Sequence, residues 1–202
     1  MKDIEQMATE SQRQSTPYQA SPHFYKHQPD DTFVIDFESD LVGPFEAIDI
    51  NPYVEDGFTL TSTPGGTYGI VLADKMFDNI NFPEIQPALQ AVNQEPGHVV
   101  GGADLSSDDL VVARADGEDF EFKGGHFSFA NVAAGAINLK NVRITFEGYR
   151  DGTLIDSFTT RIHDQGGFIT SKLDDDIDCL IIRDGQAEGW LYADNLIFET
   201  PG

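Results

Sequence analysis

NVRITFEGYRDGTLIDSFTTRI, residues 141–162, contains two alternating stretches on either side of a turn sequence. Apolar and polar residues alternate in the first stretch, which is the pattern of a strand with one buried face. Gly152 in the turn tolerates the positive φ that tight hairpin turns need. The residues expected on the buried face are Val142, Ile144, Phe146, Leu154, Phe158 and Ile162. We therefore predict an antiparallel β-hairpin.

Short alternating stretches also occur on both sides of this hairpin, with Gly, Asp and Asn between them. They are FVIDFE (33–38), DFEF (119–122), HFSF (126–129), GFITSKL (167–173), CLIIR (179–183) and GWLYADNLIFE (189–199). Two longer stretches, about 74–98 and 101–109, are loop-like. This series of short strands predicts an all-β fold, an antiparallel jelly-roll β-sandwich.

The N-terminal part of the chain differs from the rest. Residues 1–31 are rich in Gln, Ser and Pro and show no strand alternation, so they cannot bury enough apolar area to fold alone. We predict a polar N-terminal arm, either disordered or ordered on a partner during assembly, followed by the sandwich over residues 32–202. The N-terminus lacks the apolar stretch of a secretory signal, which predicts a protein made in the cytoplasm.

The charge balance excludes several classes of partner. The chain has 35 Asp and Glu against 12 Lys and Arg, a formal charge of −23. Nucleic acids and anionic membranes both require a cationic surface, and no apolar run is long enough to span a membrane. The charge favours bound cations, unless it serves solubility alone. It also favours neutral glycans over acidic ones, unless Ca²⁺ bridges the two.

One carboxylate interrupts an apolar row near the end of the chain. Strict alternation in residues 189–199 places Asp194 on the same face as Tyr192, Leu196 and Phe198. A buried unpaired charge costs several kcal/mol, roughly. Either the strand is broken at Asp194 and Asn195, where the carboxylate would cap a bulge, or a cation meets it.

The two ends of the sandwich and three stretches between them follow a known pattern. The stretches are FVIDFE (33–38), EDGFTLTS (55–62), GGHFSFANVAAG (124–135), VRITFEGYRDGTLIDS (142–157) and WLYADNLIFE (190–199). Over residues 32–200 the chain resembles the jelly-roll sandwiches of carbohydrate-binding modules and the lectin-like domains of bacterial exported proteins. The resemblance implies a structural Ca²⁺ ion. Glu38 and Asp194 match the family's metal-binding positions, and Asp36 is a weaker candidate on the face of Glu38.

Catalytic motifs do not stand out. The five histidines accompany no nucleophile motif, and G-x-S-x-G, H-E-x-x-H and the P-loop are missing from the sequence. We therefore predict a protein that is not an enzyme. Sugar binding by sandwiches needs exposed aromatic rings beside polar groups. The predicted ligand-binding residues are Tyr149 and Tyr68. Tyr149 points away from the inward face of its strand, and Tyr68 lies beside a Pro-Gly-Gly turn.

A lectin-like sandwich behind a polar arm is also similar in architecture to the head spikes of phages and gene transfer agents. That similarity implies attachment to capsular polysaccharide, a capsid or other structural protein as the partner of the arm, and a place on a particle surface or outside the cell; the chain could also form a homo-oligomer. The alternatives are a purely structural particle protein, an exported surface protein, and a glycan-active lyase or hydrolase.

Overall fold

The computed structural model describes residues 31–37, 47–49, 52–63, 68–72, 98–104, 109–130, 142–162, 166–184 and 189–201. It describes the backbone alone for residues 47–49, 68–72, 98–104, 130, 184 and 189–190. These residues form thirteen strands. None of the described residues forms a helix long and apolar enough to cross a membrane.

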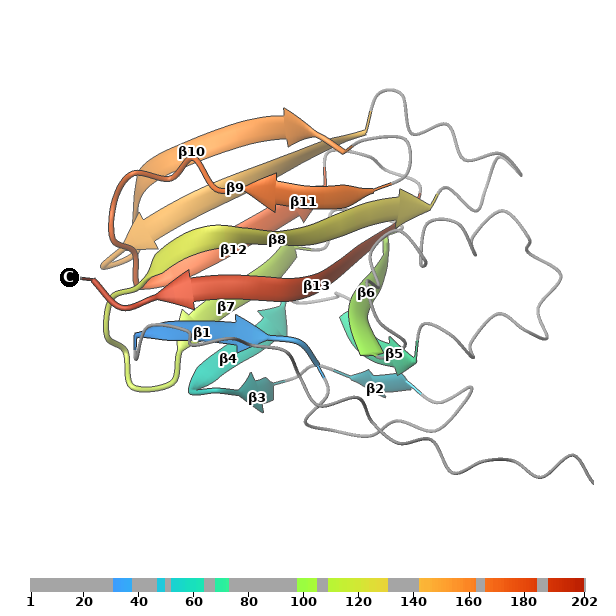
Figure 1. The fold of residues 1–202 in the computed structure, drawn as a ribbon, viewed down its shortest axis with the longest axis horizontal. Helices are drawn as coiled ribbons and strands as arrows, with labels where there is room; N and C mark the ends of the chain where they lie inside the picture. The colour runs from blue at the N-terminus through green and yellow to red at the C-terminus, as the bar shows by residue number, and fades with distance from the viewer. Residues whose placement is uncertain are drawn as a thin grey trace, which may run out of the picture.

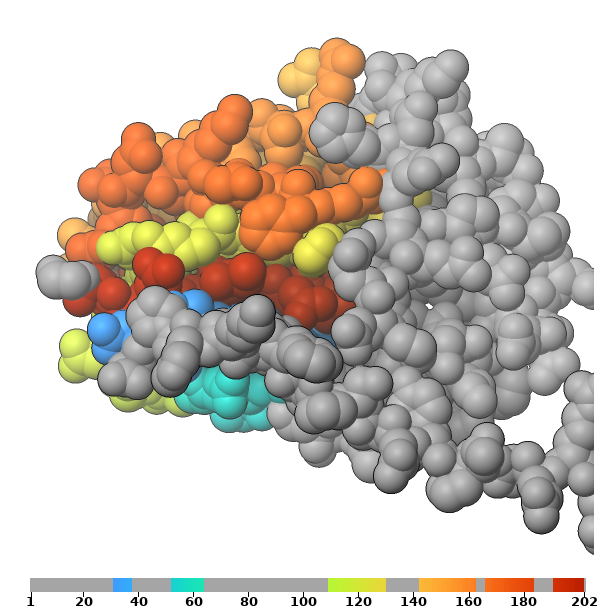
Figure 2. Space-filling model, in the orientation of Figure 1, coloured from blue at the N-terminus to red at the C-terminus, as the bar shows by residue number. Residues whose placement is uncertain are grey.

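Seven strands form one antiparallel sheet, sheet A (Figure 1). They are β1 (Thr32–Ile35), β2 (Ala47–Asp49), β5 (Tyr68–Leu72), β6 (His98–Asp104), β8 (Glu121–Ala130), β11 (Gly167–Thr170) and β13 (Gly189–Glu199). The order is β11-β8-β13-β6-β5-β2, and β1 pairs with β13 outside this path. In Figure 2, β11, β8, β13 and β1 follow one another as orange, yellow, red and blue bands.

The other six strands form sheet B. They are β3 (Tyr53–Glu55), β4 (Phe58–Ser62), β7 (Asp109–Arg114), β9 (Arg143–Arg150), β10 (Thr153–Arg161) and β12 (Cys179–Asp184). The order is β10-β9-β12-β7-β4-β3. The chain crosses between the sheets after β2, β4, β6, β7 and β8, and at every connection after β10. The predicted fold class, an all-β antiparallel jelly-roll sandwich, is confirmed.

The hairpin that predicts this fold is formed by β9 and β10. Asp151 and Gly152 alone connect the strands, and both have positive φ, 51° and 69°, as a type I′ turn requires. The pairing shifts between Leu154 and Asp156, which marks a β-bulge. Because of this bulge Leu154 pairs with outward-facing Tyr149 and is 48% exposed, so the prediction that Leu154 is buried is wrong.

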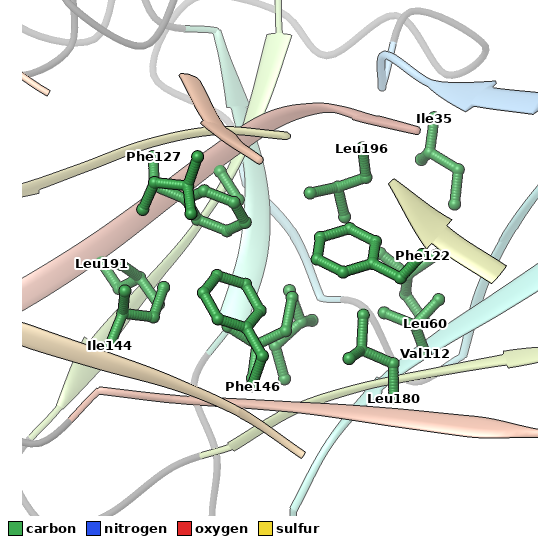
Figure 3. Close-up of a cluster of buried hydrophobic side chains, with 14 of the residues drawn as sticks. Ile35, Leu60, Val112, Phe122, Phe127, Ile144, Phe146, Leu180, Leu191 and Leu196 are labelled. Carbon is green, nitrogen blue, oxygen red and sulfur yellow. The ribbon is translucent and has the colours of Figure 1, made fainter. Parts of the chain in front are cut away.

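The core lies between the two sheets and is rich in phenylalanine. Figure 3 shows Phe127, Leu191 and Leu196 of sheet A above Ile144 and Phe146 of sheet B. The Phe146 ring lies 5.2 Å from that of Phe127 and stacks at 4.7 Å on Phe158 of the hairpin's return strand. Ile144 and Phe146 are both fully buried, so the buried face of β9 predicted from alternation is correct.

Strand β13 does not alternate strictly, because its register shifts between Asp194 and Ile197. The residues of β13 in the core cluster are Leu191, Ala193, Leu196 and Phe198. Asn195 has a positive φ of 48° and supplies the extra residue of a bulge. Asp194 therefore lies on the face of sheet A that points away from sheet B. The prediction that it shares a face with Leu196 and Phe198 is wrong.

A second bulge, on β8, cancels the first. Ile197 pairs with Gly124 and Phe198 with Phe122, so β8 has one extra residue at this point and the original register returns. Gly124 has a φ of +139°, which L side chains rarely adopt. A Cβ atom there would lie 2.3 Å from the backbone oxygen of Ile169 on β11. Glycine is therefore required where β8 passes between β13 and β11.

The first and last strands are neighbours, and one expected loop is partly a strand. Strand β1 pairs antiparallel with the last four residues of β13 (Figure 1). The expected loop over residues 101–109 is partly wrong, since β6 extends to Asp104. Its two glycines, Gly101 and Gly102, pair with β13 on one side and with β5 on the other.

Candidate functional site

The outer face of sheet B, which points away from sheet A, presents side chains in regular rows across the strands. The row nearest the β9–β10 turn consists of Leu154, Tyr149, Cys179, Ala113, Thr59 and Val54. The second row consists of Ser157, Glu147, Ile181, Val111 and Thr61. The third row consists of Thr159, Thr145, Arg183 and Asp109. Short hydroxyl and aliphatic side chains thus surround a few large polar ones.

Arg183 of β12 connects the second and third rows through two ion pairs. Its Nη1 lies 2.7 Å from Oδ2 of Asp109 on β7, and its Nε lies 2.9 Å from Oε2 of Glu147 on β9. Burial alone would lower the pKa of Arg183, but the two carboxylates raise it. The guanidinium is therefore a fixed cation that holds both carboxylates in place across three strands.

Tyr149 joins the same network from the first row. Its hydroxyl donates a hydrogen bond of 2.8 Å to Oε2 of Glu147, the oxygen that Arg183 also contacts. This bond raises the pKa of the Tyr149 phenol, so the group stays protonated and continues to donate. Beside it, Leu154 is exposed on the paired strand. The half-buried ring is thus held in one orientation on a sheet face, which suits stacking and hydrogen bonding.

Tyr68, the other predicted ligand-binding residue, lies elsewhere. It is the first residue of β5, in sheet A, where its backbone pairs with Gly102. The structure describes its backbone alone. Tyr68 and Tyr149 belong to different sheets, so the structure does not bring them together on one sheet face.

Two of the predicted metal residues, Asp194 and Asp36, belong to the region where β13 exchanges one neighbouring strand for another. The first half of β13 pairs with β6 and the last four residues pair with β1. Asp194 lies between these halves and is 3% exposed. Its Oδ1 accepts a hydrogen bond of 2.7 Å from the Asn195 backbone N–H, the bulge-capping contact expected of one alternative. Asp36 directly follows β1, and Glu38 lies outside the described residues.

A histidine lies beside Asp194 on the neighbouring strand. His126 of β8 is its register partner, and burial lowers the pKa of His126. The imidazole is therefore neutral at neutral pH and supplies no full positive charge to the buried carboxylate. Within the described ranges, no group of three or more His, Cys, Asp or Glu residues is arranged to hold a metal ion.

A buried carboxylate fixes the direction in which the chain leaves β1. Phe37 is fully buried and has a φ of +61°, which is unusual for a bulky residue. Its backbone N–H donates to Oε2 of Glu55 at 3.0 Å, and the Tyr53 hydroxyl donates to the same oxygen at 3.1 Å. Glu55, on β3 of sheet B, therefore links the end of a sheet A strand to the other sheet.

A pocket of about 500 Å³ lies apart from these residues. Its lining consists of Arg114, Gly117, Glu118, Asp119, Thr200 and Pro201. None of the predicted metal-binding or ligand-binding residues lines this pocket. Arg114 is held by an ion pair with Asp116, whose pKa is lowered chiefly by that contact.

Alternation identified Tyr149 as outward-facing, but it did not predict that Arg183, Asp109 and Glu147 form a group. These residues are distant in sequence and meet only through the register of β7, β12 and β9. The sequence did contain one signal for this group, because cations are scarce in a chain of charge −23. An arginine at the end of an apolar strand, such as Arg183, is then a candidate for the centre of an ion-pair network.

No family model matches the chain, and no curated protein matches it. Among solved structures, the carbohydrate-binding module TmCBM61 in complex with β-1,4-galactotriose is 10% identical, with a TM-score of 0.37 over 72% of this chain and 90% of that one. The family 11 carbohydrate-binding module of Clostridium thermocellum, with a mixed-linked tetrasaccharide, is 12% identical, with a TM-score of 0.37 over 84% and 96%.

The arabinose-bound α-L-arabinofuranosidase MgGH51 is 8% identical, with a TM-score of 0.41 over 77% of this chain and 27% of the enzyme. TM-scores below 0.5 do not establish a shared ligand or activity with any of the three.

Proposed function

We propose that this protein is a non-catalytic attachment module that binds cell-surface polysaccharide on the outer face of sheet B. The observation that supports this most is the ring of Tyr149, held by Glu147 beside exposed Leu154 and a series of Ser and Thr hydroxyls. Sugar rings stack on aromatic side chains through their C–H faces, while their hydroxyls bond fixed polar groups. The face offers both kinds of contact.

The polar groups of this face suit recognition. Glu147 is partly exposed and ion-paired with Arg183, so it is held as an acceptor for sugar hydroxyls, while buried Asp109 holds Arg183 in place. One tyrosine ring supplies weak affinity, and several copies on one surface would raise the avidity by about 10²–10⁴.

Tyr149→Ala tests the proposal. We expect affinity for the recognised polysaccharide to fall about tenfold, which corresponds to about 1.4 kcal/mol, with the melting temperature nearly unchanged. Glycan-array binding followed by affinity electrophoresis measures the loss. Phe168→Ala is the matched control, because Phe168 is a 44% exposed ring on β11 of sheet A. Full binding by Tyr149→Ala, or equal loss in Phe168→Ala, would place the ligand on another surface.

We also propose a structural Ca²⁺ ion at the junction of β1 and β13. The donor set fits a hard cation, since Asp194 and Asp36 offer carboxylate oxygens and the chain continues from β1 towards Glu38. Asp194 and Glu38 would be the principal ligands, as the family resemblance implies, with Asp36 as a further candidate. The ion would join the two ends of the sandwich, because β1 and β13 are paired at this point.

Chelation tests the calcium proposal. EDTA is expected to lower the melting temperature by several degrees, because a ligand that binds only the folded state stabilises it by mass action. Differential scanning fluorimetry before and after readdition of Ca²⁺ measures the effect, and Asp194→Asn should abolish it. An unchanged melting temperature, together with no calcium in elemental analysis, would contradict the proposal.

The biological setting is a further proposal. A polysaccharide-binding sandwich behind a polar arm suits a spike of a phage-like particle or gene transfer agent. In that setting residues 1–31 would contact a capsid protein and the sandwich would contact the host capsule. The support for this setting is the architecture inferred from the sequence.

A further inference from the structure

The arginines of the described residues fall into two groups. Arg114, Arg150 and Arg183 each form ion pairs with neighbouring aspartate or glutamate residues. Arg143 and Arg161 form no ion pair with any residue that the structure describes, and both are exposed. In a chain with 35 acidic residues and 12 basic ones, acidic partners are abundant. Arg143 and Arg161 thus differ from the other three arginines in having no acidic partner within the part of the chain that the structure describes.

The two arginines are direct neighbours. Arg161 of β10 is the register partner of Arg143 of β9, so both side chains lie on one face of the hairpin. Ile144, next to Arg143, and Ile162, next to Arg161, are buried, so the arginines point outward on the outer face of sheet B. Opposed residues have Cβ atoms about 5 Å apart, and like charges at this distance destabilise a sheet.

Among the described residues, the neighbours of this pair on the same face carry no unmatched charge. The adjacent pair along the hairpin is Thr145 and Thr159, whose hydroxyls are hydrogen-bonded to each other at 2.9 Å. On the neighbouring strand β12, Arg183 is the register partner of Thr145. The charge of Arg183 is balanced by its ion pairs with Asp109 and Glu147. The end of the β9–β10 hairpin away from its turn is therefore a small cationic position with hydroxyl donors beside it.

We propose that Arg143 and Arg161 form an anion clamp that binds a carboxylate or sulfate group of an acidic polysaccharide. The proposal rests on the proposed function and specifies its substrate class. Two guanidinium groups can each donate paired hydrogen bonds to the oxygens of one anionic group. Such a ligand would relieve the like-charge repulsion between the two guanidinium groups.

The clamp and Tyr149 can contact one glycan chain. Arg143 and Tyr149 are six residues apart on β9 and point to the same side, which places them about 20 Å apart at about 3.3 Å per residue. A polysaccharide lying along the hairpin would meet the ring near the turn and the clamp at the other end. The net charge of −23 does not prevent this, because charges more than about 8 Å away are largely screened at physiological ionic strength.

The experiment compares the full-length protein with Arg143→Gln and Arg161→Gln. Lys172→Gln is the matched control, because Lys172 is another exposed cation outside the hairpin and its loss changes the net charge equally. Each protein is titrated with polyuronates and sulfated polysaccharides, and with the carboxyl-reduced or desulfated form of each. We expect wild-type protein and Lys172→Gln to prefer an acidic form, and each Arg→Gln variant to bind that form about tenfold more weakly.

Two further measurements separate recognition from a structural role. The double variant Arg143→Lys/Arg161→Lys keeps the charge but not the paired donors, so it should bind more weakly than wild type. The melting temperature of each Arg→Gln variant should stay equal or rise, since like-charge repulsion is removed. Equal binding of acidic and neutral forms, or unaltered binding by both Arg→Gln variants, would overturn the clamp and leave the Tyr149 surface standing. Binding of no polysaccharide by wild type would overturn both.

Discussion

Gly124→Ala is expected to lower the free energy of unfolding by about 3 kcal/mol or more. Two effects add at this position. The backbone φ of +139° is one that L side chains rarely adopt, and the new Cβ would lie 2.3 Å from the backbone oxygen of Ile169. A backbone atom cannot rotate away as a side chain can, so β8 and β11 must separate locally. Chemical denaturation of the purified variant measures the loss.

Gly57→Ala separates the two effects. Gly57 also has a positive φ, +80°, but a Cβ there would meet no atom within 4 Å. Its replacement therefore adds backbone strain without a clash and should cost about 1 kcal/mol. If Gly124→Ala costs no more than Gly57→Ala, then β8 and β11 are not packed as closely as the structure shows.

Glu55→Ala is expected to lower the free energy of unfolding by about 2–4 kcal/mol. The substitution removes the acceptor of the Phe37 N–H and of the Tyr53 hydroxyl, and both donors belong to buried residues. A buried donor without an acceptor loses its full solvation energy. Phe37 would also lose the contact that holds its unusual positive φ, so the end of β1 should loosen.

Glu118→Ala is the control for this change, because Glu118 is exposed and its side chain makes no hydrogen bond within the described residues. That variant should stay within about 0.5 kcal/mol of wild type. Hydrogen exchange on Glu55→Ala should show faster exchange at the end of β1 than in β9 and β10. Wild-type stability of Glu55→Ala would mean that the carboxylate does not hold the Phe37 turn.

Local patterns predicted the hairpin because its determinants are local. Gly152 permits the turn, and Ile144 and Phe146 alternate with polar residues over one short strand. The same rule failed at Leu154 and at Asp194, where a bulge adds one residue and reverses the faces that follow. Asn195 is the local sign of the bulge in β13, since asparagine tolerates positive φ better than most residues.

The candidate site was predictable in part for a similar reason. Tyr149 could be assigned to the outer face from the alternation in β9 alone, because Ile144 and Phe146 of the same strand point to the buried face. Its connection through Glu147 to Arg183 depends on which strands pair and in which register, and those are set by the whole sheet. The opposition of Arg143 and Arg161 follows from the bulge in the hairpin, which alternation does not reveal.

The proposed function assigns distinct tasks to the parts of the sandwich. The Glu55 contact joins the end of β1 to sheet B, and the two compensating bulges keep β8 and β13 in one register. Sheet B then presents Tyr149 and the arginines on strands instead of loops, so their spacing is fixed by backbone pairing. A surface of this kind can match an extended repeating polymer without large rearrangement on binding.

Mapping the contact surface by NMR tests whether polysaccharide binds the outer face of sheet B. Oligosaccharides of the best ligand on a glycan array are titrated into the isotope-labelled protein, and backbone amide shifts are followed. We expect the largest changes in β9, β10 and β12, around Tyr149 and Arg183 and extending towards Arg143. Changes confined to sheet A, or no saturable change with any glycan that binds on the array, would show that the ligand does not bind this face.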